Sequence, residues 1–196
     1  MKPFLKILIV SCFVSIYGLG CAQPSSSESV RPYIRNQFSV NFAVLRTAEN
    51  KTSHHMMNPT LCPSLGIHYG LNDWLELGAS SAIRKMDFSS DKSVFFQCYT
   101  AEAKAHLLPA IIKSSFYIVD VYATAQIGLS HYPNGDIETI QSVTKLCCGG
   151  NVGLTLNPSR HFGFFGEYGY INADYFKNYL RFGFNIRFGG PKKWQK

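Results

Sequence analysis

One stretch near the C-terminus decides the fold: Leu180-Arg181-Phe182-Gly183-Phe184-Asn185-Ile186-Arg187-Phe188. Every even-numbered position holds a large apolar residue, and every odd-numbered position holds a polar, charged or glycine residue. This period of two predicts a β-strand with one apolar and one hydrophilic face. The apolar face is too continuous to leave in water, and a face that carries Arg181 and Arg187 is a poor fit for a packed core. Lipid outside and a polar interior satisfy both faces.

The same alternation recurs along the chain and predicts further strands. Short connections alternate with longer, more polar ones, which is typical of a membrane barrel with short turns at one face and longer loops at the other. A water-soluble barrel around a ligand is the alternative, but it would carry its apolar face inward. We therefore predict an all-β fold, an eight-stranded antiparallel up-and-down transmembrane β-barrel over residues 35–189. The predicted strands are 37–47, 60–70, 74–85, 93–107, 115–130, 143–156, 161–171 and 180–188.

The first 22 residues are typical of a secretory signal peptide. A basic start precedes an apolar run over residues 7–17, and Gly20 and Ala22 supply the small residues of a cleavage site. The run is too short to span a bilayer as a helix. A lipoprotein signal with an acylated Cys21 is the alternative. Residues 23–34 are expected to form a polar linker, and residues 190–196 a basic periplasmic tail.

The formal charge of +7 comes from scattered basic residues. Nucleic-acid binding needs a clustered basic face, so we predict no nucleic-acid partner. Attraction to anionic headgroups is more plausible for an exported chain. We expect outer-membrane lipid and lipopolysaccharide to be the partners of a monomeric barrel.

Two segments carry a resemblance to known proteins. The segment Gly66-Ile67-His68-Tyr69-Gly70-Leu71-Asn72-Asp73-Trp74-Leu75-Glu76-Leu77-Gly78 resembles the second hairpin of small bacterial outer-membrane barrels of the OmpA/OmpX-like and porin-like kind. The last strand resembles the C-terminal signal read by the outer-membrane insertion machinery, with Phe188 as its final aromatic residue. The chain departs from that pattern by continuing to Lys196. The resemblance implies a bacterial outer-membrane location and the insertion machinery as a partner.

Aromatic residues near strand ends are expected to form girdles at the two membrane interfaces. Charged residues on the opposite strand faces are expected to meet in the lumen, together with His68, His106 and His161. Such charges must be paired or hydrated, because an isolated buried charge is very costly. The predicted interface aromatics at the short-turn side are Tyr69, Trp74, Tyr117, Phe162 and Phe188. The predicted lumen ion-pair network comprises Glu76, Arg84, Glu102, Lys104, Asp120, Glu167, Arg181 and Arg187.

These features favour a structural or surface-interaction role with an ion-paired lumen. Eight strands enclose an interior that side chains can fill, so a wide pore is not expected. A narrow porin or transporter for small solutes is the first alternative. A lipid A-modifying enzyme is the second, but adjacent Ser130 and His131 would point to opposite faces of a strand. We predict no catalytic residues, no cofactor and no metal, although His54-His55 invites a metal hypothesis.

Four cysteines follow the predicted signal peptide, and an exported compartment permits disulfides. Adjacent Cys147 and Cys148 would point to opposite strand faces, so a bridge between them is not expected. A Cys62–Cys98 bridge is one possibility. The alternative is that these residues fill space as small semi-apolar side chains.

Overall fold

A computed structural model describes residues 33–47, 61–88, 92–112, 117–132, 142–173 and 176–189 of the chain. Within these ranges, no helix is long and apolar enough to cross a bilayer. The strands are β1 Gln37–Thr47, β2 Cys62–Gly70, β3 Leu75–Phe88, β4 Lys92–His106, β5 Val119–Tyr132, β6 Val143–Leu156, β7 Phe162–Ile171 and β8 Asn178–Gly189, with the short helix α2, Leu107–Ile111, between β4 and β5.

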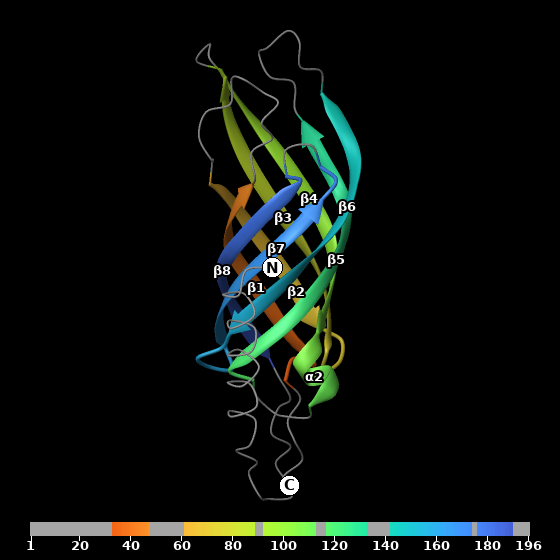
Figure 1. The fold of residues 1–196 in the computed structure, drawn as a ribbon, viewed down its shortest axis with the longest axis vertical. Coiled ribbons are helices and arrows are strands. Elements are labelled where there is room, and N and C mark those ends of the chain that lie inside the picture. The colour runs from red at the N-terminus through yellow and green to blue at the C-terminus, as the bar shows by residue number, and fades with distance from the viewer. Residues whose placement is uncertain are drawn as a thin grey trace, which may run out of the picture. The chain divides into compact units, whose positions relative to one another are not determined.

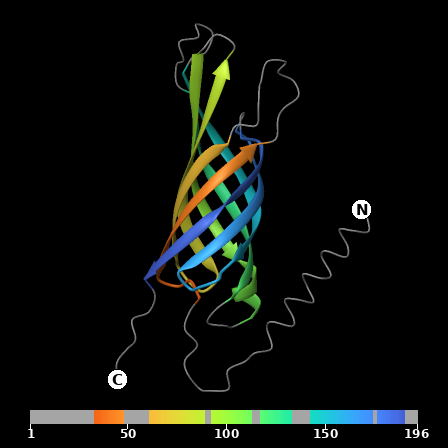
Figure 2. The ribbon, with the colours of Figure 1, turned by 90° about the vertical axis from the view of Figure 1, so that its left-hand side faces the viewer.

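The strands close into one antiparallel barrel (Figure 1). Each strand pairs with its neighbours in sequence, and β1 pairs with β8 from Gln37↔Gly189 to Thr47↔Tyr179. The start of β1 and the end of β8 therefore lie at the same end, which we call the turn end; we call the other the loop end. At the loop end β3 and β4 project beyond the neighbouring strands (Figure 2). The predicted eight-stranded up-and-down barrel is confirmed.

The predicted strand bounds differ from the observed ones mainly between β4 and β5. Residue 107 was predicted to end a strand, but it begins α2, and β5 starts at Val119 rather than at residue 115. Pro109 has no N–H to donate to a strand ladder, and its fixed φ suits the first turn of a helix. The N–H of Ile112 donates to the carbonyl of Leu108 (2.8 Å) and ends the turn.

The connection between β2 and β3 is a tight turn, as the Asn72-Asp73 pair predicts. Asn72 Oδ1 accepts hydrogen bonds from the backbone N–H groups of Trp74 (2.9 Å) and Leu75 (2.8 Å). The N–H of Leu71 donates to the carbonyl of Leu75 (2.9 Å). An asparagine side chain that bonds its own downstream backbone in this way fixes the turn locally.

The apolar strand faces point outward, which is the reverse of a soluble protein. Alternation along β5 is typical, because its even-numbered residues are mostly buried and its odd-numbered residues face out. Lipid is the solvent that matches such an exterior. Exposed large apolar residues on the strands include Phe38, Phe42, Val44, Leu65, Ile67, Leu77, Ile83, Ile127, Leu129, Val152, Leu154, Leu156, Phe164, Phe182, Phe184 and Phe188.

Candidate functional site

The lumen is organised around one arginine held between two carboxylates. Arg181 and Glu167 are direct cross-strand partners on β8 and β7, and Arg181 Nε donates to Glu167 Oε2. Arg181 Nη1 reaches Glu102 Oε1 on β4 at 3.4 Å. All three side chains are buried. The guanidinium therefore joins β4 to β7 and β8 through the barrel interior.

The two carboxylates have further side-chain partners on neighbouring strands. Glu102 accepts a hydrogen bond from Ser80 Oγ at 2.5 Å and lies 2.8 Å from His68 Nε2. Tyr122 Oη donates to Glu167 Oε1 at 2.7 Å. A buried carboxylate needs such partners, because unpaired charge in a low-dielectric interior is strongly destabilising. These contacts make the centre of the lumen a connected polar network.

A second ionic group lies nearer the turn end. His106 lies between two carboxylates: Nε2 is 3.5 Å from Glu76 Oε2, and Nδ1 contacts Asp120 Oδ2. Lys104 Nζ lies 4.6 Å from the centroid of the Tyr122 ring. Tyr122 also bonds Glu167, so Lys104 and Tyr122 lie beside the central group.

Tyr33, which precedes β1, lies buried at the turn end of the barrel. Its hydroxyl accepts hydrogen bonds from Asn157 Nδ2 (2.6 Å) and Arg187 Nη1 (3.2 Å). The Arg187 guanidinium lies 5.0 Å from the centroid of the Tyr33 ring. Burial raises the pKa of the Tyr33 phenol well above its ordinary value, so the hydroxyl stays neutral. Tyr33 and Ile34, the last two residues of the predicted polar linker 23–34, are buried, while residues 23–32 lie outside the described residues.

The position of Tyr117 differs from the predicted one. It was expected among the interface aromatics, but its side chain is buried and its ring centroid lies 4.9 Å from that of Tyr33. Because β5 begins only at Val119, Tyr117 lies outside the strand alternation and turns inward. Its hydroxyl donates to the carbonyl of Ile112. The other four predicted aromatics remain at least partly exposed: Tyr69, Trp74, Phe162 and Phe188.

We expect the Tyr33→Phe substitution to lower the free energy of unfolding by about 1–3 kcal/mol, because two buried donors lose their acceptor. Urea unfolding in detergent micelles measures the change. Tyr170→Phe is the matched control, since Tyr170 is exposed on the outer face and its loss of a hydroxyl should stay within about 0.5 kcal/mol. Equal stability of the two variants would show that the Tyr33 hydroxyl does not stabilise the turn end.

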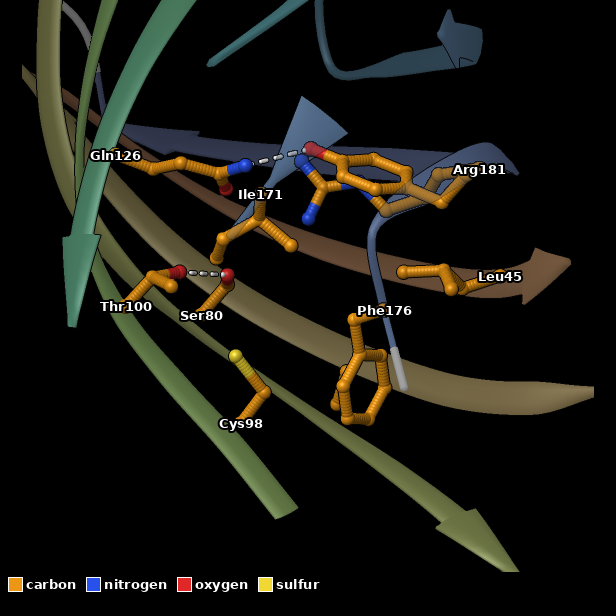
Figure 3. Close-up of a pocket in the computed structure, with 10 residues that line it drawn as sticks. Leu45, Ser80, Cys98, Thr100, Gln126, Ile171, Phe176 and Arg181 are labelled. Carbon is orange, nitrogen blue, oxygen red and sulfur yellow. Dashed lines mark hydrogen bonds between the residues drawn. The ribbon is translucent and has the colours of Figure 1, made fainter. Parts of the chain in front are cut away.

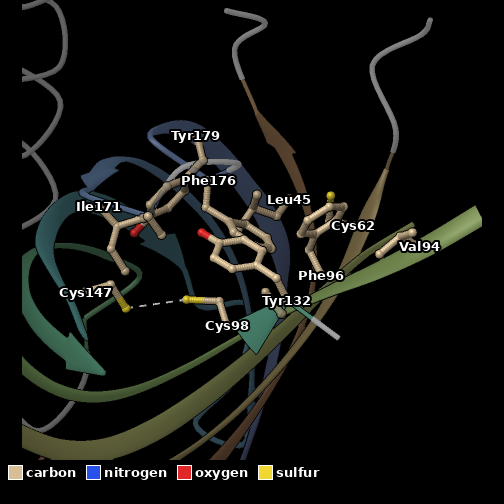
Figure 4. Close-up of a cluster of buried hydrophobic side chains, with 12 residues drawn as sticks. Leu45, Cys62, Val94, Phe96, Cys98, Tyr132, Cys147, Ile171, Phe176 and Tyr179 are labelled. Carbon is tan, nitrogen blue, oxygen red and sulfur yellow. Dashed lines mark hydrogen bonds between the residues drawn. The ribbon is translucent and has the colours of Figure 1, made fainter. Parts of the chain in front are cut away.

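A cluster of buried, mostly apolar side chains lies in the interior near the loop end. This cluster, which we call the cap, contains buried side chains from all eight strands, together with Ala173 and Phe176 from the connection between β7 and β8 (Figure 4). Close packing of such side chains leaves little room for water between them. The members of the cap are Leu45, Cys62, Ala82, Val94, Phe96, Cys98, Tyr132, Cys147, Ile171, Ala173, Phe176 and Tyr179.

A small cavity lies between the cap and the central arginine (Figure 3). Its volume is about 20 Å³, and its lining includes Phe176, Tyr179, Gln126 and Arg181. Such a volume suits a single water molecule. Tyr179 Oη accepts hydrogen bonds from Gln126 Nε2 (2.9 Å) and Asn151 Nδ2 (3.1 Å) beside it.

All eight residues of the predicted ion-pair network lie on inward strand faces and are buried. The structure brings Glu102, Glu167 and Arg181 together, whereas Glu76 and Asp120 meet at His106. Arg187 contacts Tyr33, a residue that the sequence pattern did not single out. Tyr122 and Tyr179 were not among the predicted site residues. Alternation could have found them, because even-numbered residues of β5 and odd-numbered residues of β8 face inward.

The described residues contain no group of three or more His, Cys, Asp or Glu side chains that could hold a metal ion. His54 and His55 lie outside the described residues. Ser130 is buried while His131 is half-exposed and lies 3.0 Å from Thr144 Oγ1, so the two side chains point to opposite faces as predicted. No arrangement of nucleophile and base is formed by this pair.

The structure does not place Cys98 beside Cys62, the pairing that the sequence left open. Cys98 Sγ lies 3.9 Å from Cys147 Sγ, so the nearest thiol to Cys98 is on β6 rather than on β2 (Figure 4). Cys147 is buried and Cys148 is exposed, as adjacent strand residues should be. No disulfide joins the four described cysteines.

No family model matches the sequence, and no curated protein matches it. Solved structures do share the fold. The outer membrane protein OprG of Pseudomonas aeruginosa matches with a TM-score of 0.59 at 11% identity, over 83% of this chain and 100% of that chain. The N-terminal β-barrel domain of OprF from the same organism matches with a TM-score of 0.57 at 12% identity, over 79% and 98%. Ail, the attachment invasion locus protein of Yersinia pestis, matches with a TM-score of 0.50 at 19% identity, over 79% and 99%. The chain therefore has the fold of the small eight-stranded outer-membrane barrels.

Proposed function

We propose that this protein is an outer-membrane barrel of a diderm bacterium with a structural or surface-interaction role, exercised through its longer connections at the loop end. The observation that carries the proposal is that buried side chains fill much of the interior of the described barrel. Tyr33 and Ile34 lie at the turn end, the cap lies at the loop end, and buried ion pairs lie between. A barrel filled in this way is a rigid support rather than a conduit.

The pocket beneath the cap speaks against transport through this part of the interior. It measures about 20 Å³, a volume that suits one water molecule. Opening a path would also separate Arg181 from its carboxylates at large electrostatic cost. We expect purified protein in planar lipid bilayers to give no reproducible conductance. Regular single-channel steps would replace this proposal with the narrow-porin alternative.

The surface role is supported by the sequence at the loop end and by one structural neighbour. The connections after β1 and β5 at the loop end, residues 48–61 and 133–142, are longer than the turn-end connections 71–74 and 157–161, whereas the loop-end connection 89–91 is short and the turn-end connection 107–118 is long. Ail, whose name describes an attachment and invasion protein, has the same fold. The proposed partners are lipopolysaccharide and surface macromolecules that meet these connections, while lipid surrounds the strands.

Epitope accessibility tests the proposed location and orientation. One variant carries an epitope after Ser53 in the first long connection, and the matched control carries it after Lys196. We expect antibody to label the first variant on intact cells and the control only after the outer membrane is permeabilised. Labelling of the control on intact cells would invert the orientation, and recovery of both variants as soluble periplasmic protein would overturn the outer-membrane location.

A further inference from the structure

Two cysteine side chains meet inside the cap, and their position carries an inference about covalent modification. Cys98 Sγ on β4 and Cys147 Sγ on β6 are 3.9 Å apart, and both residues are buried. The two thiols point toward one another (Figure 4). A disulfide is about 2.05 Å long and joins Cα atoms that lie no more than about 7 Å apart, so a bond here requires the sulfurs to approach by about 1.9 Å and β4 and β6 to draw together at this level.

The register explains why residues on non-adjacent strands come so close. Cys98 lies opposite Ser130 on β5, and Cys147 lies opposite Gly128 on the same strand. Strands two places apart are separated by about 9–10 Å in a flat sheet, and the curvature of the barrel turns their inward side chains toward one another. Gly128 carries no side chain. A Cβ there would lie 1.8 Å from the carbonyl oxygen of Tyr99, which shows how closely β4 and β5 approach at this point.

We propose that Cys98 and Cys147 are an oxidation site, and that the exported protein carries a disulfide linking β4 to β6 across β5. The inference rests on the proposed export, because thiols are kept reduced in the cytosol and oxidised outside it. The reaction is exchange with a disulfide donor, either a protein thiol oxidase or glutathione disulfide. One S–S bond forms between the two sulfurs and one breaks in the donor. The two cysteines lose two protons and two electrons, and the donor gains them as two thiols.

The position of the pair sets what the bond would do. The two cysteines are 49 positions apart in sequence, so the closed loop contains all of β5 and the connection that follows it. Cross-linking a loop of this size restricts the unfolded chain and stabilises the folded one. The bond would also fix β4 and β6 beneath Tyr132 and Phe176, which are neighbours in the cap. Oxidation would therefore fix the packing of the cap at the loop end.

Peptide mapping tests the linkage directly. Full-length protein is purified from outer membranes in mild detergent, without reductant, and is denatured in excess N-ethylmaleimide before digestion. We expect one cross-linked peptide joining Cys98 to Cys147, with Cys62 and Cys148 recovered as maleimide adducts. Recovery of Cys98 and Cys147 as adducts, or a linkage to Cys62 or Cys148 instead, would overturn the proposal.

A refolding experiment tests the oxidation site independently of the proposed outer-membrane location. The same protein is unfolded, reduced and refolded in detergent micelles with a glutathione redox buffer, so that no cellular compartment is involved. Formation of the Cys98–Cys147 linkage there supports the oxidation site even if the cellular protein proves not to be exported. Folded barrel that remains fully reduced under these conditions overturns it.

Matched variants then measure the effect of the bond. We expect Cys147→Ser to lower the midpoint of thermal unfolding of the oxidised protein by roughly 5–15 °C, and dithiothreitol during refolding to remove the difference from the parent. Cys148→Ser, one residue away on the outer face, should leave the midpoint and its redox dependence unchanged. A Cys147→Ser midpoint that differs equally with and without dithiothreitol would assign the residue to packing alone and reject the disulfide.

Discussion

Arg181→Met should destabilise the barrel by about 3–5 kcal/mol, because it leaves two buried carboxylates without their shared cation. Glu102 and Glu167 have no solvent-exposed alternative, since both side chains are buried within the lumen. The residual partners Ser80, His68 and Tyr122 supply hydrogen bonds but no permanent charge. The urea midpoint of the refolded barrel in detergent micelles, read from heat-modifiable gel migration, measures the loss.

Two further variants test the cause of that loss. Lys177→Ala removes an exposed cation near the start of β8 and should change stability by no more than about 0.5 kcal/mol. Adding Glu167→Gln to Arg181→Met should recover part of the loss, because it removes one of the two stranded charges. If Arg181→Met matched Lys177→Ala, the central ion pairs would not contribute to the fold.

Ile127→Arg should cost about 2–4 kcal/mol, because it places a charge on the lipid face near the middle of a strand. Ile127 is exposed on the outside of β5, where the neighbouring outward residues are Ala125 and Leu129. A soluble protein would tolerate an arginine at an exposed position with almost no loss. The substitution therefore distinguishes a lipid-facing exterior from a water-facing one.

Depth provides the control for this experiment. Val143 is also exposed and opens β6 at the loop end, opposite Tyr132. An arginine there lies near the interface, where the cost falls to about 0–1 kcal/mol. Measured in lipid vesicles, Ile127→Arg should shift the unfolding midpoint and Val143→Arg should barely do so. Equal effects at the two positions would contradict the membrane placement of β5.

The strands were predictable because the parity of a residue number determines the face on which a strand residue lies. Once an apolar face is assigned to lipid, the bounds of β1 and β6 and the inward placement of Glu76, Asp120 and Arg187 follow from alternation alone. Helix α2 did not follow. Its five residues form a short apolar run without a period that could distinguish helix from strand. The misplaced Tyr117 is a consequence of that helix.

The partners of the lumen charges were only partly predictable. Glu167 and Arg181 face each other across β7 and β8, so neighbouring strands in a meander bring them together. The contact between Arg181 and Glu102 crosses the interior and depends on how the barrel curves. Tyr33 lies before the first alternating segment, so no periodic signal connected it to Arg187. The alternation in the sequence predicts whether a residue faces the lumen, whereas the curvature of the closed barrel determines which lumen residues touch.

The seam between β1 and β8 implies an order of events in assembly. It joins the first strand to the last along the whole length of β1, and Tyr33 then bonds Asn157 and Arg187, which lie 124 and 154 positions away in sequence. Contacts of such long range form late, because the intervening chain must first be brought together. A chain that lacks β8 can neither close the ring nor seat Tyr33. We therefore expect the contacts of Tyr33 with Asn157 and Arg187 to be among the last to form, after β1 has paired with β8.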